Sequence, residues 1–345
     1  MRLVLCVAAG LAALAIGGWI LPQGVLSEPG LDVPGEPAEI ESTGSYTALL
    51  PFVTRPLLVP PPEEGLGAVN YFRALAGLPP ALENQAYSRG AWYHARYMVK
   101  NDYLGHHEDR ANAWYTSEGA QAGVNSNLMV SGDVNATDLR AVRVWVQAPF
   151  HLVGIIDPAL REVGFGSYRE AIGVWRMGAA LDVLRGLGSV PSTVSFPVYY
   201  PRDNAYMPVL EHSTESPSPL TSCPGYSAPS GPPIVLQIGD GRETPHVTAT
   251  SLRRDGTEIA HCIFDETSYT NPDAALQALG RSILDARDAI VVMPRDRLAS
   301  GSVYTVSIAV NGAVHRWSFT ALDLSDVATG GLSLPSAFDS PPGPR

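Results

Sequence analysis

The fold is decided by four short pieces of residues 82–166: GHHED at 105–109, YTSEG at 115–119, NSNL at 125–128 and WVQAPFH at 145–151. The pieces are rich in histidine, acidic, amide and hydroxyl side chains, the residue types that carry binding and catalysis on loops. The stretches between them have apolar residues at helical or strand-like spacing. In chain order, this region therefore predicts a helix, a His-bearing loop, a second helix, a second His and a strand.

Periodic apolar residues predict the helices. Recurrence every three to four residues indicates one helix at about 65–76 and a longer one at about 82–101. Thr137 is the predicted N-cap of a third helix. Pro149 is expected to end that helix, which would leave His151 just past its terminus.

Composition predicts the remaining segments of this half. Residues 120–135 are small and polar and are predicted to be irregular. Glycine-containing apolar runs at 162–166 and 172–177 predict strands. His94 lies on the apolar stripe of the helix at 82–101, where a hydrogen-bonded core histidine is favoured over a ligand.

The C-terminal part has the alternation of β structure. Apolar residues alternate along 304–310, Asn311-Gly312 favours a type I′ turn, and Trp317 and Phe319 share one face of the return strand. This predicts a hairpin. Two further elements are predicted here, a first strand and a short helix: 234–238 and 273–284.

The N-terminus has the pattern of an export signal. The apolar run at 3–21 follows Met1-Arg2 and is near the length that spans a bilayer, so a cleaved signal peptide and a retained anchor both remain open. Four segments lie outside the predicted domains. They are the signal or anchor, an extended Pro-rich linker, a second Pro-rich linker and a disordered tail: 1–22, 23–62, 211–233 and 323–345.

Charge excludes some partners. The formal net charge is −11, and no run of basic residues occurs. Nucleic acids and anionic lipid headgroups favour basic surfaces, so neither is an expected partner. A membrane contact is expected only through the possible anchor at 3–21.

Two cysteines follow the signal, Cys223 and Cys262. In an oxidising compartment such a pair predicts one disulfide, which would stabilise the fold by roughly 3–4 kcal/mol in the chain-entropy model. A two-thiol metal site is disfavoured, because no further cysteine lies near either one. The protein is thus expected to be extracellular or at the cell surface.

The order of these motifs resembles the CAP superfamily (cysteine-rich secretory proteins, antigen 5 and plant pathogenesis-related proteins), most closely its bacterial secreted branch. The piece Asn70–Arg73 and the Ala-rich second helix resemble the opening of that domain. Residues 298–306 with 317–319 resemble the closing hairpin of bacterial immunoglobulin-like domains. The resemblance implies an α+β protein: a CAP-type α-β-α sandwich at 63–210, then an all-β immunoglobulin-like sandwich at 234–322.

The resemblance also implies a cleft in which two His and two Glu can bind a divalent metal. His106 and His151 match the two family histidines. Ser126 stands where the first glutamate of the family motif is expected, and the second has no clear match. A zinc site needs three or four ligands, so Glu108 or Glu118 would have to complete it. A metal-free polar cleft is favoured over a zinc or other divalent-cation site.

Other interpretations of the same residues stay open. Ser126, a histidine and Glu118 have the residue types of a hydrolytic triad, but no Gly-x-Ser-x-Gly motif marks an activated serine. The residues predicted to contact a ligand in the cleft are His106, Glu108, Glu118, Ser126, Asn127 and His151. Five aromatics are expected in the core, or else to line a groove for lipid or glycan: Trp92, Tyr93, Tyr97, Trp114 and Tyr115.

The resemblance therefore implies an extracellular or cell-envelope binding module whose ligand is a small molecule, lipid, glycan or protein. The first alternative is a metal-dependent hydrolase acting on peptide or cell-wall material, with His106, Glu118 and His151 as candidate catalytic residues. The second is a structural, adhesin-like surface protein with a vestigial cleft. An enzyme is disfavoured among the three.

Overall fold

The computed structural model describes residues 5–6 and 60–323. The predicted signal or anchor, the first linker and the tail lie outside these residues, apart from residues 5–6 within the signal and 60–62 and 323 at the borders of the other two. The described part mixes helices and sheets, which confirms the α+β class.

The first sheet has five strands in the order β1-β3-β5-β4-β2. Neighbouring strands are antiparallel except β2 and β4, which are parallel. The strands are β1 Leu5–Cys6, β2 Leu82–Glu83, β3 Ser126–Ser131, β4 Glu162–Arg169 and β5 Met177–Asp182.

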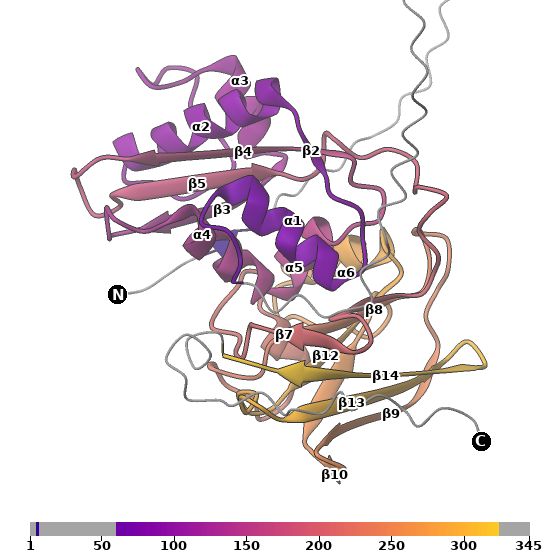
Figure 1. Cartoon of the computed structure of the whole chain (residues 1–345). Coiled ribbons are helices and arrows are strands. Elements are labelled where there is room, and N and C mark those ends of the chain that lie inside the picture. Colours follow the sequence, from indigo (N-terminus) through magenta and orange to yellow (C-terminus); the bar gives the residue numbers. More distant parts are fainter. Residues whose placement is uncertain (1–4, 7–59, 324–345) are drawn as a thin grey trace, which may run out of the picture. The chain divides into compact units, whose positions relative to one another are not determined.

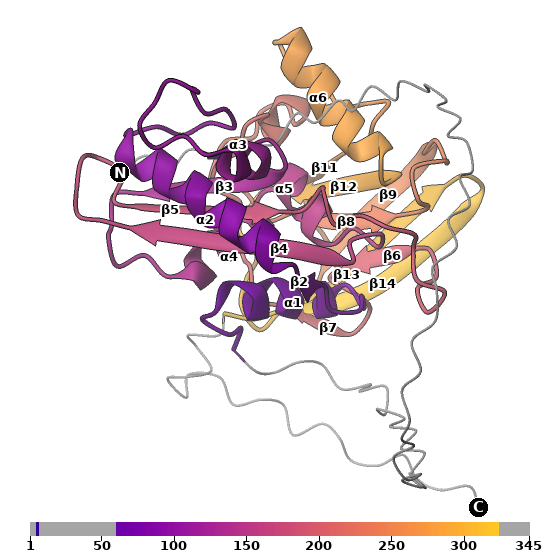
Figure 2. The same cartoon turned by 90° about the horizontal axis from the view of Figure 1, so that it is seen from above.

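Helices cover both faces of this sheet, in an α-β-α arrangement. The helices are α1 Gly65–Leu75, α2 Gln85–Lys100, α3 Ser117–Gly123, α4 Asp138–Val146 and α5 Pro149–Ile155. Figure 1 shows α2 and α3 on one face and α1, α4 and α5 on the other. Seen from above, α2 crosses over β4 (Figure 2), with which it makes extensive contacts.

Two glycines of β4 allow this close approach. A Cβ on Gly164 would lie 2.2 Å from the carbonyl carbon of Tyr87, and one on Gly166 would lie 2.1 Å from the backbone nitrogen of Trp92. These distances are well inside van der Waals contact, so any larger residue would push α2 away from the sheet. The loop that follows α2 carries His106, and its position therefore depends on this packing.

The sequence predicted α1, α2 and α4 to within a few residues. α2 begins at Gln85 because the side chain of Asn84 caps its first turn, accepting from two backbone N–H groups. Thr137 caps α4 as predicted. As expected, α4 ends before Pro149. Pro149 itself occupies the first turn of α5, where a missing N–H costs nothing, so the prediction that His151 lies just past a helix is wrong and the residue lies inside α5.

Two further predictions are wrong. Residues 120–135 are not irregular, because they include the end of α3 and all of β3. β3 is fully buried although half of its residues are polar, so composition concealed it. The strand predicted at 172–177 begins only at Met177. Before it, Gly173 has a positive φ, and the carboxylate of Asp102 accepts from the N–H groups of Val174 and Trp175, which holds a turn.

The C-terminal region contains two further sheets, ordered β10-β9-β13-β14-β7 and β11-β12-β8-β6. The strands are β6 Val198–Tyr200, β7 Ala205–Met207, β8 Ile234–Gln237, β9 Val247–Arg254, β10 Thr257–Glu258, β11 His261–Phe264, β12 Ala289–Pro294, β13 Val303–Val310 and β14 Ala313–Ala321. β6 and β7 precede the predicted second domain in sequence and join its sheets. The domain boundaries and the immunoglobulin-like assignment stay predictions.

Local predictions in this region are confirmed. β13 and β14 form the hairpin, with Asn311 at φ 50° and Gly312 at φ 79°, as a type I′ turn requires. Helix α6 Ala274–Asp285 begins after the predicted position, where Asp273 caps it. A short 3-10 helix, η1, spans Pro219–Ser222.

The predicted disulfide is confirmed. Cys223 follows η1, Cys262 lies on β11, and they are bonded with a Cα–Cα distance of 5.5 Å. That distance is typical of disulfides. Among the described helices, none has the length and apolarity to cross a bilayer.

Candidate functional site

His106 is the centre of the candidate site, in the loop between α2 and α3. Its Nδ1 donates to the backbone oxygen of Gly123 at 2.7 Å, so the other ring nitrogen, Nε2, carries the lone pair when the ring is neutral. Nε2 is buried and has no hydrogen-bond partner. Burial, with a smaller contribution from His151, lowers the pKa of His106 to about 4. At neutral pH the site therefore presents an unpaired acceptor.

His151 is paired with a carboxylate that the sequence analysis missed. His151 Nδ1 donates to Glu215 Oε1 at 2.7 Å, and the backbone N–H of His151 donates to the same oxygen at 3.0 Å. Both side chains are fully buried, and Glu215 Oε2 has no hydrogen-bond partner. A carboxylate that holds one imidazole nitrogen fixes the tautomer and orientation of the ring.

Glu215 comes from the segment 211–233, which is predicted as a Pro-rich linker. A second histidine anchors the same segment: His212 Nδ1 donates to the backbone oxygen of Gln147 at 2.8 Å, and burial lowers its pKa. The segment thus contacts the C-terminal end of α4 and the first turn of α5. No local pattern marks Glu215, because its partner lies 64 residues earlier in the chain.

His94 is a hydrogen-bonded core histidine, as predicted. It is fully buried, with Nδ1 bonded to Glu108 Oε1 and Nε2 bonded to the backbone oxygen of Gly105, each at 2.9 Å. The second oxygen of Glu108 accepts from the N–H of Thr116. Both oxygens of Glu108 are therefore engaged in fixing the loop that carries His106.

Ser126 and Asn127 begin β3, and strand alternation directs them to opposite faces of the sheet. Asn127 Nδ2 donates to the backbone oxygen of His151 at 3.2 Å, so it supports that residue. Ser126 is completely buried and its hydroxyl has no hydrogen-bond partner. The serine–histidine hydrogen bond of a hydrolytic triad is thus not formed.

The residues do not fit a metal centre. Glu118 is exposed on α3 and contacts its neighbour Ser117, and Glu108 is committed to His94. Within residues 60–323, no three His, Cys, Asp or Glu side chains gather in a way that could hold a metal ion. His106 and His151 lack the third ligand that even a catalytic zinc site needs. The metal site stays a prediction without support from this geometry.

The sequence predicts the five aromatic residues either in the core or along a ligand groove, and the structure does not place all of them in the core. Tyr97 is buried, and its hydroxyl accepts from the N–H of Asp109. Trp92 and Trp114 are 38% and 36% exposed, and the Arg96 guanidinium lies 5.1 and 5.3 Å from their ring centroids. These two rings are on the surface of α2 and the loop after it, and the cation covers them.

The lowered pKa of His106 predicts an acid-sensitive stability. In the unfolded chain, His106 binds a proton near its ordinary pKa of 6.5, whereas in the folded chain it does so only near pH 4. The free energy of unfolding therefore falls as the pH falls from about 6.5 to about 4. At about pH 4.5 the loss from this group is about 2 kcal/mol. We expect His106→Asn to remove that loss and the exposed control His107→Asn to retain it. Urea unfolding of both variants at about pH 4.5 and 7 measures the difference; equal pH dependence of the two would contradict the assignment.

One comparison with known families matches a part of the chain. The model of the cysteine-rich secretory protein family, CAP, matches residues 66–174. This match supports the CAP superfamily for that region, whose proteins are commonly extracellular and act at the family level as interaction modules. Neither a curated protein nor a solved structure matches the chain.

Proposed function

We propose that this chain is an exported CAP-domain protein that binds an extracellular or cell-envelope ligand through the polar site around His106 and His151. The main observation in support is that Nε2 of His106 is buried and has no hydrogen-bond partner. A buried polar atom without a partner costs about 1–3 kcal/mol. A ligand that donates a hydrogen bond to this atom removes that cost, so the site is suited to recognising a hydroxyl or amide group.

Other features support a ligand site rather than a purely structural core. Ser126 Oγ and Glu215 Oε2 are also buried without partners. His94, by contrast, has both ring nitrogens hydrogen-bonded. Three residues of the site, His106, Ser126 and Glu215, thus each carry a buried atom without a hydrogen-bond partner, whereas the neighbouring core histidine carries none. The disulfide is in keeping with an oxidising compartment.

The organisation of the whole chain is part of the proposal. Residues 3–21 direct export, as a cleaved signal or a retained anchor, and the protein belongs to the bacterial secreted branch of the superfamily. The CAP domain occupies 63–210, and residues 234–322 form an immunoglobulin-like spacer or interaction domain, whose two sheets β6 and β7 join from the end of the first region.

Binding to isolated cell envelopes of the producing organism tests this function. His106→Asn is the sharpest variant, because the asparagine amide can still donate to Gly123 while Nε2 is lost. Ser126→Ala is the second, since removing an unpaired buried hydroxyl does not weaken the fold. We expect both to lower the bound fraction about tenfold, and His107→Asn to leave it unchanged. If all three variants sediment with envelopes like the parent, the structural, adhesin-like interpretation replaces this one.

The His151–Glu215 pair is the feature in keeping with one alternative, a metal-dependent hydrolase of peptide or cell-wall material, although the described residues supply no third metal ligand. A histidine oriented by a carboxylate is the usual arrangement at both metal ligands and general bases. Calorimetric titration of zinc into the full chain distinguishes the two functions. Micromolar or tighter binding that is lost in His106→Asn supports the hydrolase; no zinc binding removes it.

A further inference from the structure

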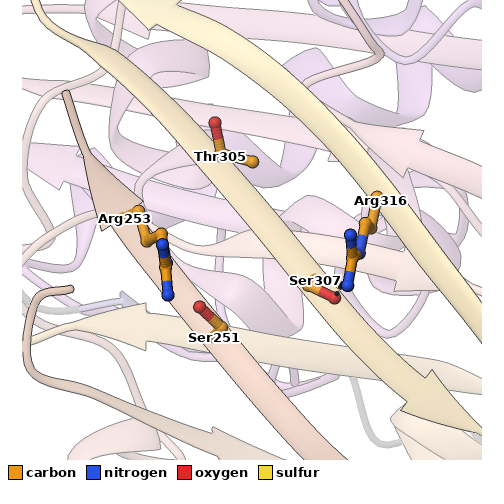
Figure 3. A pocket seen from close by; sticks show the side chains of 5 residues that line it. All are labelled: Ser251, Arg253, Thr305, Ser307 and Arg316. Atoms are coloured by element: carbon orange, nitrogen blue, oxygen red, sulfur yellow. Dashed lines mark hydrogen bonds between the residues drawn. The ribbon is translucent and has the colours of Figure 1, made fainter. Parts of the chain in front are cut away.

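A second candidate site lies in the C-terminal region, on the outward face of β9, β13 and β14. A groove of about 340 Å³ is present there (Figure 3). Its lining consists of two arginines and three hydroxyl residues: Ser251, Arg253, Thr305, Ser307 and Arg316. The alternating residues Leu252, Val306 and Trp317 are buried on the other face of the sheet. The groove therefore belongs to the solvent side.

The strand register places the two arginines at opposite corners of the groove. Arg253 on β9 is opposite Thr305 on β13, and Arg316 on β14 is opposite Ser307. Figure 3 shows the arginines on either side of β13, with the hydroxyl groups near them. Neighbouring strands are about 4.8 Å apart, so both long side chains can contact one ligand that lies across β13.

The guanidinium groups keep donors available. Arg253 uses Nε to bind Glu258, at 3.1 Å, and Arg316 uses Nε to bind the Ser307 hydroxyl, at 3.3 Å. Within the described part of the chain, the terminal nitrogens of these two arginines have no hydrogen bond or ion pair. Paired terminal nitrogens of arginine match the geometry of carboxylate and phosphate groups.

Glu258 indicates what the groove recognises. Its carboxylate accepts from the Ser251 hydroxyl at 2.7 Å, from the Leu252 N–H at 3.2 Å and from Arg253. The Ser251 hydrogen bond is the main reason that the pKa of Glu258 is below its usual value. One end of the groove thus already stabilises an oxygen anion, while Arg316 at the other end has no acidic partner among the described residues.

We propose that this groove binds acidic glycans. Carboxylate or phosphate groups of the sugar chain pair with Arg253 and Arg316, and sugar hydroxyls exchange hydrogen bonds with Ser251, Thr305 and Ser307, which both donate and accept. Single-stranded nucleic acid is disfavoured, because the lining has no aromatic side chain on which bases could stack. The inference does not depend on the His106 site.

Calorimetry on the full chain at about 20 mM ionic strength, where screening is weak, tests the proposal. The probes are tetragalacturonate, a glycerol-phosphate tetramer and neutral maltotetraose. We expect one or both acidic probes to bind at least about tenfold more tightly than the neutral one, and the acidic probe that binds identifies the anionic group. Failure of both acidic probes, or equal binding of maltotetraose, would overturn the proposal.

Variants locate the binding. Arg253→Gln with Arg316→Gln should weaken acidic-probe binding about 100-fold, roughly tenfold for each arginine. Arg254→Gln is the matched control: it removes the same charge one residue along β9, on the opposite face, and should change affinity less than about twofold. Glu258→Gln removes a competing carboxylate and should tighten binding about threefold. Equal affinities of the double variant and the Arg254 control would place the binding elsewhere.

Discussion

Glu215→Ala is expected to destabilise the protein by about 3–5 kcal/mol. The Glu215 carboxylate is fully buried and accepts from both the ring Nδ1 and the backbone N–H of His151. Truncation removes the acceptor of the buried ring Nδ1 and leaves the backbone N–H with the Ala148 oxygen, at 3.1 Å. It also removes the contact of Glu215 with the first turn of α5. Unfolding in urea, followed by circular dichroism, measures the loss.

Two companion variants separate burial from charge. Glu211→Ala removes a carboxylate four residues earlier whose ion pair with Arg297 is exposed, so its loss should be at most about 1 kcal/mol. Glu215→Gln keeps an acceptor oxygen but no charge, and should fall between the two. A Glu215→Ala protein as stable as the Glu211→Ala control would show that the buried pair contributes nothing to the fold.

The sequence correctly predicted the elements whose structure is determined by residues close together in the chain. α4, capped by Thr137, and the hairpin turned at Asn311-Gly312 are determined within about ten residues, and the structure contains both. Contacts between distant segments left no such pattern. Glu215 lies among serines and prolines, so nothing nearby indicates a buried acid that reaches α5.

The candidate site illustrates the same division. A motif order identified His106 and His151 as central residues, and the model of the CAP family supports the region that contains them. The sequence could not distinguish Glu108 from Glu118, because both are acids in short polar stretches of sequence. Packing decides between them: Glu108 is fixed by His94 inside the loop, whereas Glu118 is exposed. β3 was missed for a related reason, because its polar Ser126 and Asn127 are buried by the layers around them.

Arg73→Met is expected to cost about 4 kcal/mol, because a fully buried guanidinium is replaced by a side chain of similar length without donors. Burial lowers the pKa of Arg73 to about 10, so the group is still charged at neutral pH. Its donors reach four backbone oxygens at 2.7–3.1 Å, those of Pro79, Ile155, Asp157 and Leu160.

Three of these bonds fasten the end of α1 to the last residue of α5 and to the segment that follows it, and α5 carries His151. The matched control is Arg89→Met, which makes the same change at an exposed position of α2 and should alter stability by less than about 0.5 kcal/mol. Arg73→Lys retains the charge, but one ammonium group cannot reach four separate carbonyls, so most of the loss should remain. The urea midpoints of the three variants measure these differences in stability. Full stability of Arg73→Lys would mean that the charge alone matters. Reduced stability of both Arg73 variants would assign the effect to the hydrogen bonds that position α5.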